Sequence, residues 1–186
     1  MHPDHTGGLV PLLFYRKIFS INSPLTLIGP PELKSFVFDN FKYCKINHTQ
    51  NLKWVDISLN HSIALDENIT INTMLMKHKI PCWGYRVSDN LKTLTFITDT
   101  LPNSNSIQLS MNSDILIHES TYTEMKSIQA SKHFHSTNVQ AMNIADQANV
   151  KKLFLTHFSK QISDKELLSW TWNGQNCVVF DEKQKI

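Results

Sequence analysis

The hydrophobic positions of this 186-residue chain fall into short apolar runs separated by longer stretches of mixed character. Short runs of β-branched and aliphatic residues bounded by turn residues are typical of buried strands. Strands are therefore expected at Leu25–Ile28, Ile69–Met76, Leu94–Thr98, Asp114–His118, Leu153–Thr156 and Cys177–Phe180.

Helices are expected in the stretches between these strands. Pro31 suits the first turn of a helix, and Thr137 and Gln140 have the spacing of a capping box. The expected helices cover Leu9–Phe19, Glu32–Phe41, Ala141–Ala148 and Asp164–Trp170. Strands and helices in this order predict a layered α/β domain in which helices cover a sheet.

Polar residues of the kinds that bind metals follow four of the predicted strands. They are His78, Asp99, the pair His118-Glu119, and His157. Each has an ordinary reading by itself, since a histidine after a strand can simply be hydrogen-bonded and an aspartate can make a turn. Ligands of α/β proteins collect at strand ends, so four such ends together predict one functional cleft.

The amino-acid composition indicates which broad class of protein this chain belongs to. A hydrophobic content of 41%, a charged content of 18% and a net charge of +2 are ordinary for a globular protein and do not by themselves indicate nucleic acid. Nine histidines favour metal binding, and three scattered cysteines, Cys44, Cys82 and Cys177, are expected to be reduced, buried thiols. No signal peptide or apolar run of ~20 residues is present, so we expect a cytoplasmic protein without a membrane segment.

The first residues form a compact metal-binding pattern, His2-Pro3-Asp4-His5, followed by Gly7-Gly8. Imidazole nitrogens and carboxylate oxygens are the ligands of catalytic zinc sites, which keep one position open for water. The two glycines allow a tight backbone turn directly after the ligands.

Five segments resemble the metallo-β-lactamase superfamily and, within it, the ribonuclease Z family of zinc phosphodiesterases that trim tRNA 3′ ends. They are 2–9, His78 with 84–86, 96–100, 116–121 with 135–137 and 140–141, and 153–159. The paired His-Glu-Ser-Thr and His-Ser-Thr segments are the most specific of these. The resemblance implies an α/β fold, the αββα sandwich of the superfamily without its N-terminal strands, as a single domain over 1–186.

The same resemblance implies a site with two zinc ions, although manganese or iron would accept the same donors. His2 and His78 would bind one ion, whereas Asp4, His5 and His157 would bind the other. Asp99 would bridge the two.

The resemblance also implies catalytic roles. Asp4 would orient or deprotonate the hydroxide that attacks the phosphodiester, and His135 with Glu119 would assist the leaving oxygen. The substrate would be RNA or a smaller phosphodiester. The alternatives from the residues alone are a hydrolase of esters, lactones or amides on the same fold, and an inactive truncated remnant.

Two departures from the family pattern concern the start of the chain. The first histidine of the superfamily motif would precede Met1, which predicts unequal metal affinity, with the site of Asp4, His5 and His157 filled first. The strands that precede the motif in the superfamily would also be missing, and an incomplete sheet exposes edges. Pairing with a partner chain, such as a second copy in a homodimer, would cover them.

A third departure concerns substrate specificity. Bacterial members of the family carry a flexible tRNA-gripping arm between the Gly-Tyr-Arg segment and the bridging aspartate. Only residues 86–98 separate Tyr85 from Asp99, which leaves no room for that arm. Ser159-Lys160-Gln161 also stands where the family has Ser-x-Arg-Tyr. The sequence therefore predicts the chemistry more firmly than the tRNA specificity.

Overall fold

A computed structural model describes residues 2–44, 51–59 and 61–178 of the chain. The chain divides into two compact units, Met1–His61 and Ser62–Ile186, and each has its own cluster of buried hydrophobic residues. The single domain expected over 1–186 stays a prediction.

The first unit packs helices against a two-stranded parallel sheet. Its elements are α1 (Pro3–Thr6), α2 (Leu9–Ile18), β1 (Leu25–Gly29), α3 (Pro31–Tyr43) and β2 (Leu52–Asp56). Leu13 of α2 packs with Val37 and Phe41 of α3, and Leu27 and Trp54 of the sheet pack against this cluster. The amphipathic faces of the two helices thus form a small core over the sheet.

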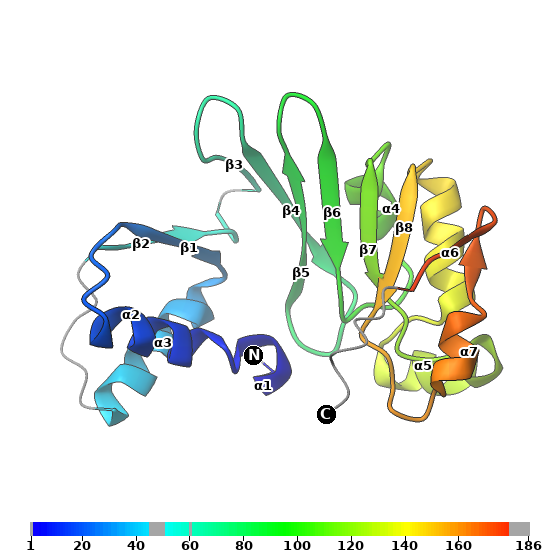
Figure 1. The fold of residues 1–186 in the computed structure, drawn as a ribbon, viewed down its shortest axis with the longest axis horizontal. Coiled ribbons are helices and arrows are strands. Elements are labelled where there is room, and N and C mark those ends of the chain that lie inside the picture. Colours follow the sequence, from blue (N-terminus) through cyan, green and yellow to red (C-terminus); the bar gives the residue numbers. More distant parts are fainter. Residues whose placement is uncertain (1, 45–50, 60, 179–186) are drawn as a thin grey trace. The chain divides into compact units, whose positions relative to one another are not determined.

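The second unit is built on a six-stranded mixed sheet in the order β3-β4-β5-β6-β7-β8 (Figure 1). Its strands are β3 (Ser62–Ala64), β4 (Thr70–Met76), β5 (Cys82–Ser88), β6 (Thr93–Ile97), β7 (Ile115–Glu119) and β8 (Lys152–Thr156). Neighbours from β3 to β6 are antiparallel, whereas β6, β7 and β8 are parallel. This mixed sheet with its helices confirms the predicted α/β class.

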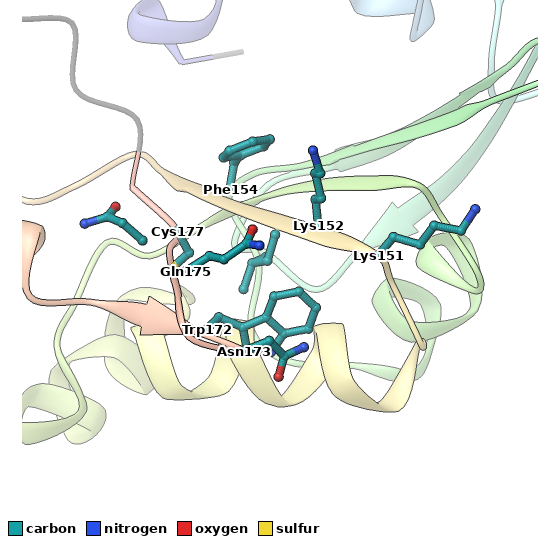
Figure 2. A pocket seen from close by; sticks show the side chains of 9 residues that line it. Lys151, Lys152, Phe154, Trp172, Asn173, Gln175 and Cys177 are labelled. Carbon is teal, nitrogen blue, oxygen red and sulfur yellow. The ribbon is translucent and has the colours of Figure 1, made fainter.

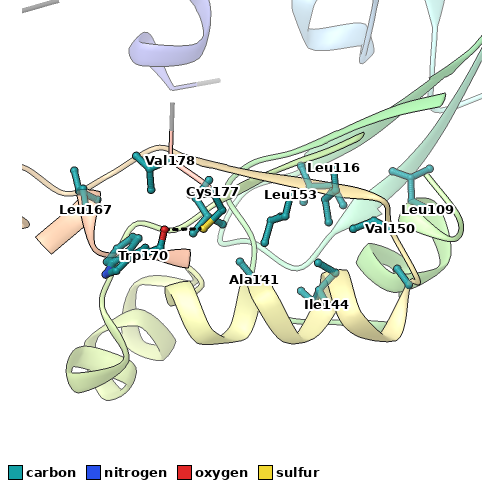
Figure 3. Packing of buried hydrophobic residues seen from close by; sticks show 14 of the residues in the cluster. Leu109, Leu116, Ala141, Ile144, Val150, Leu153, Leu167, Trp170, Cys177 and Val178 are labelled. Atoms are coloured by element: carbon teal, nitrogen blue, oxygen red, sulfur yellow. Dashed lines mark hydrogen bonds between the residues drawn. The ribbon is translucent and has the colours of Figure 1, made fainter. Parts of the chain in front are cut away.

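Helices α4 (Ser104–Ser110) and α6 (Asn138–Gln147) pack against this sheet. The second unit also contains the short 3₁₀ helix η1 (Glu124–Lys126), α5 (Ser127–His133) and α7 (Asp164–Leu168). The predicted capping box forms at the start of α6, where Thr137 and Gln140 exchange side-chain and backbone hydrogen bonds. Figure 3 shows Ala141 and Ile144 of α6 facing Leu116 of β7 in the main hydrophobic core.

The last expected strand, Cys177–Phe180, is described only in part. β9 (Thr171–Trp172) and β10 (Gln175–Asn176) form a short antiparallel hairpin before it. The Leu155 N–H then donates to the Cys177 carbonyl (2.7 Å), and Val178 makes an isolated parallel bridge to Leu155. Val179 and Phe180 lie outside the described residues.

A pocket lies where this hairpin meets the beginning of β8 (Figure 2). Lys151 and Lys152 are on its rim with Trp172, but the Lys151 ammonium is paired with Asp114 at 2.7 Å. The pocket is lined by residues at the amino end of β8, whereas His157 follows the carboxyl end. It is therefore separate from the expected functional cleft.

Membrane-spanning helices and cysteine burial concern the described part of the chain. No helix there is both long and apolar enough to cross a membrane. No disulfide joins the three cysteines of the described residues. Cys177 is buried, as predicted, whereas Cys82 is half-buried and Cys44 is exposed, so the prediction of burial was wrong for Cys44.

Candidate functional site

The carboxyl ends of four strands in the second unit lie at one edge of its sheet. β6, β7 and β8 are parallel, and β4 runs in the same direction because it and β6 are both antiparallel to β5. Strand ends that share a direction open onto the same cleft. His78, Asp99, Glu119 and His157 follow or end these strands, so the sheet brings them together.

Asp99 is buried and lies between histidines from two different strand ends. Its Oδ2 is 3.8 Å from His78 Nε2, and its Oδ1 is 3.3 Å from His157 Nε2. The ring of His135 joins them, with centroid distances of 5.1 Å to His78 and 5.5 Å to His157. Three imidazoles thus surround one carboxylate.

The backbone at Asp99 and His157 is in the left-handed region, with φ of 48° and 59°. Non-glycine residues rarely adopt this conformation, and residues held in unusual backbone regions at functional sites cost of order 1–3 kcal/mol each. Each strand turns sharply where it ends, and the side chains of the two residues meet there.

His78 has a fixed orientation. Its Nδ1 lies 2.9 Å from the carbonyl oxygen of Phe134, which can only accept a hydrogen bond. The proton is therefore on Nδ1, and the lone pair is on Nε2, the nitrogen that faces Asp99. Phe134 presents this carbonyl at the end of α5 with φ of 62°.

Glu119 is fully buried at the end of β7 and accepts several hydrogen bonds. The N–H of Thr100 donates to Oε1 (2.6 Å), and the N–H of Ser136 donates to Oε2 (3.2 Å). His135 Nδ1 lies 2.9 Å from Oε1. Burial opposes ionisation of the Glu119 carboxyl, but His135 and the other donors outweigh it and lower its pKa.

Local structure also fixes His135. Its N–H donates to the Ala130 carbonyl (2.9 Å), which ties it to α5, and Ser136 next to it donates from Oγ to the Thr100 carbonyl (2.6 Å). Thr137 then begins α6 through its capping box. The segment that carries His135 is thus held between two helices and the loop after β6. These contacts fix the position of His135 beside Glu119.

His118 belongs to the core. It is fully buried, and its Nδ1 lies 2.8 Å from the Glu119 carbonyl. Removal from water disfavours the imidazolium and lowers the pKa of His118 below its ordinary value of 6.5.

This buried histidine should make folding sensitive to mild acid. The unfolded chain takes up a proton at His118 near pH 6.5, whereas the folded chain resists it. The stabilisation is fully present above pH 6.5 and is lost as the pH falls below that value, by at most about 1.4 kcal/mol per pH unit for one proton. We expect urea unfolding between pH 7 and pH 5 to show a shallower pH dependence for His118→Gln than for the wild type. The exposed His133, changed to Gln, is the control, and equal slopes for His118→Gln and wild type would contradict the expectation.

The N-terminal motif lies in the first unit. His2, Asp4 and His5 sit at or beside α1, where the His5 N–H donates to the His2 carbonyl (3.2 Å) and the Thr6 hydroxyl donates to the same oxygen (3.1 Å). This short helix places the three motif residues within one turn of chain. Their expected meeting with the strand-end residues of the second unit stays a prediction.

The segment between Tyr85 and Asp99 is a tight β-hairpin. β5 and β6 pair directly, and Asp89 closes the turn by accepting from the N–H groups of Leu91 (2.7 Å) and Lys92 (2.6 Å). No arm is inserted at this place, which agrees with the short spacing in the sequence.

Sequence reasoning found the side chains of this cleft but missed two groups that orient them. One is the Phe134 carbonyl, for which the sequence offers no signal, because any residue has a carbonyl. The other is Thr121, whose hydroxyl lies 2.8 Å from His157 Nδ1. Its place in the His-Glu-Ser-Thr segment was the available signal.

Comparisons with known proteins identify the family of this chain. A family described as the beta-lactamase superfamily domain matches residues 1–158. A protein named Ribonuclease Z from Prochlorococcus marinus is 28% identical over 240 residues, covering all of this chain and 75% of the relative. Ribonuclease BN from Proteus mirabilis is 26% identical, covering 89% of this chain and 71% of the relative.

Solved structures of similar fold point to the same superfamily. Human tRNase Z, short form, superposes with a TM-score of 0.73 at 25% identity, covering 87% of this chain and 70% of that one. A metallo-β-lactamase fold protein from Bacillus subtilis has a TM-score of 0.72 at 22% identity and covers 89% of this chain and 64% of that one, which supports the fold. The resemblance drawn from the sequence motifs is confirmed. With most of its length matched by the family model, this chain belongs to the beta-lactamase superfamily domain family.

Proposed function

We propose that the protein is a metal-dependent phosphodiesterase that cleaves RNA near the 3′ ends of tRNA precursors, as its relatives named ribonuclease Z and tRNase Z suggest. The observation that carries the proposal is the pairing of His135 with the buried Glu119 beside the cluster of His78, Asp99 and His157. Cleavage of an RNA phosphodiester expels a basic ribose oxygen that an acid assists, and this pair is suited to that task.

The donor atoms of the second unit suit a divalent cation. Two ligand atoms at about 2.1 Å from one tetrahedral zinc are about 3.4 Å apart. The separation of His157 Nε2 from Asp99 Oδ1 is 3.3 Å, and that of His78 Nε2 from Asp99 Oδ2 is 3.8 Å. The donors are also of the kind that zinc prefers, imidazole nitrogen and carboxylate oxygen.

We assign the ligands as the motifs imply. His2 and His78 would hold one zinc, Asp4, His5 and His157 would hold the other, and Asp99 would contribute to both. When bound, the two ions supply a hydroxide at neutral pH and neutralise charge on the phosphoryl oxygens. Manganese or iron would fit the same donors.

The protein's own groups complete the reaction. Asp4 would orient the attacking nucleophile or accept its proton. His135 gives a proton to the leaving oxygen from Nε2, because Nδ1 is held by Glu119 at 2.9 Å. The carboxylate of Glu119 favours the imidazolium form, which is the form that a general acid needs. The cytoplasmic location predicted from the sequence suits an RNA substrate.

The proposal is tested by giving the purified chain three substrates in the presence of zinc. They are an RNA with a 3′ extension, the chromogenic bis(p-nitrophenyl) phosphate and a lactone. We expect hydrolysis of the two phosphodiesters, and the activity should be lost on chelation and recovered with zinc. Hydrolysis of the lactone without either phosphodiester would overturn the proposal in favour of acyl hydrolysis.

The tight β5–β6 hairpin leads to an expectation about which RNA substrates the protein distinguishes. Because this hairpin carries no arm, we expect weak discrimination between a full tRNA precursor and a short single-stranded RNA that shares its 3′ extension. The two RNAs, compared at equal concentration, measure this directly.

A further inference from the structure

The hydroxyl of Thr121 lies at the centre of the cleft, between the acid pair and a proposed metal ligand. Thr121 Oγ1 is 2.6 Å from Glu119 Oε2 and 2.8 Å from His157 Nδ1. His135 Nδ1 is further away, at 3.3 Å. One hydroxyl thus contacts residues from two strand ends, β7 and β8.

The hydrogen-bond partners of Glu119 determine where the protons lie. Backbone N–H groups of Thr100 and Ser136 donate to its two oxygens. Its carboxylate is an acceptor, so the Thr121 hydroxyl gives its single proton to Oε2 at 2.6 Å. The oxygen of that hydroxyl is then left with lone pairs only.

The proton on His157 follows from this. Because Thr121 Oγ1 can only accept from the ring, the contact at 2.8 Å requires a proton on His157 Nδ1. The neutral ring then has its lone pair on Nε2, the atom that lies 3.3 Å from Asp99 Oδ1. This is the tautomer that a metal ligand binding through Nε2 must have.

We propose that Thr121 is a positioning residue that holds His157 in its metal-binding tautomer and connects that ligand to Glu119. The proposal rests on the proposed function, in which His157 binds metal and Glu119 serves the acid. The chain Glu119–Thr121–His157 has the arrangement by which carboxylates orient metal-bound histidines, with a hydroxyl inserted between the two. The metal ligand and the acid pair thereby share one buried carboxylate.

A purely structural role is the competing explanation. The Thr121 carbonyl accepts from the Ser159 N–H (3.2 Å), so the residue also joins the loops after β7 and β8 through its backbone. If only this link mattered, removing the hydroxyl would leave the tautomer of His157 unchanged. The tautomer is therefore the measurement that separates the two roles.

The test uses ¹⁵N-histidine NMR on the metal-free full chain, with the His157 signals assigned by comparison with His157→Gln. We expect the wild type and Thr121→Ser to show the proton on Nδ1 of His157. Thr121→Val, which has nearly the same shape without the hydroxyl, should move the ring toward the Nε2–H form. Its affinity for zinc, measured by titration with zinc alone, should fall about 10–100-fold. Thr121→Ser should retain the wild-type affinity.

An Nε2–H tautomer of His157 in the wild type would overturn the proposal, and this outcome does not depend on whether Thr121→Val folds. Unchanged tautomer and zinc affinity in a folded Thr121→Val would overturn it as well. Neither measurement uses catalysis. A protein that shows the expected tautomers but hydrolyses no phosphodiester would refute the proposed function and leave the positioning role intact.

Discussion

Replacing Asp99 by asparagine is expected to remove most of the zinc affinity and to slow phosphodiester hydrolysis about 10²–10⁴-fold. The two oxygens of Asp99 face His157 and His78, so one carboxylate is available to both proposed ions. Stabilisation of developing charge by bound metal is worth several kcal/mol, and each 1.36 kcal/mol is a factor of about ten in rate. Zinc titration by calorimetry and hydrolysis of bis(p-nitrophenyl) phosphate measure the two effects.

Asparagine is a better test substitution than alanine at this position because of the backbone conformation. Asp99 has φ of 48°, a conformation that asparagine adopts readily and alanine does not. The free energy of unfolding should therefore change little, and the loss can be assigned to the charge. Asp89→Asn is the matched control, since Asp89 closes the exposed β5–β6 turn and an asparagine can accept the same hydrogen bonds. Tight zinc binding by Asp99→Asn would contradict the assignment of Asp99 as the shared ligand.

The sequence predicted the strands of the site well because their signal is local. An apolar run followed by polar residues marks the ends of β6 and β8, and the structure places Asp99 two residues after the end of β6 and His157 directly after β8. When these strands pair in parallel, their carboxyl ends lie at the same edge of the sheet, so the polar residues that follow them come together.

The strand β5 was not predicted from the sequence because its conformation depends on contacts with distant parts of the chain. Its residues Cys82–Ser88 mix polar and apolar types without clear alternation. Gly84 leaves room for Leu109, which would come within 2.8 Å of an added Cβ, and Arg86 turns to the carbonyls of Leu109 (2.9 Å) and Met111 (2.8 Å). These partners are on and beside α4, far along the chain, so no local pattern reveals them.

The helix α4 was not predicted from the sequence for a related reason. Ser104–Ser110 contains few residues that favour helices, and the segment is helical because Asn103 caps it by accepting from the Ser106 N–H (3.1 Å). Its apolar Leu109 is then buried against the sheet. A short polar segment of this kind is helical only in the presence of the surface it covers.

Within the site, the sequence revealed the side chains but not their protonation. His78 and His157 are recognisable as candidate ligands from their places after strands. The tautomer of each depends on a partner contributed by another part of the fold, the Phe134 carbonyl for His78 and the Thr121 hydroxyl for His157. Such partners are defined by geometry and carry little sequence signal.

Replacing His135 by alanine should separate acid catalysis from metal binding. We expect zinc affinity to remain within a few-fold of the wild type, because His135 Nδ1 is engaged with Glu119 at 2.9 Å and lies 3.9 Å from Asp99. Cleavage of RNA should slow about 10²–10⁴-fold, the usual contribution of a positioned general acid. His133→Ala, which removes an exposed histidine bonded to Tyr122, is the matched control and should cleave RNA normally.

The leaving group makes this experiment decisive. A ribose oxygen leaves as a poor, basic alkoxide and needs a proton, whereas p-nitrophenolate is stable without one. His135→Ala should therefore lose far less activity on bis(p-nitrophenyl) phosphate than on RNA. Equal losses on the two substrates would mean that the substitution disturbs the metal site or the fold. Equal activity of His135→Ala and wild type on RNA would remove His135 from the acid role and leave its contact with Glu119 as a link between β7 and α6.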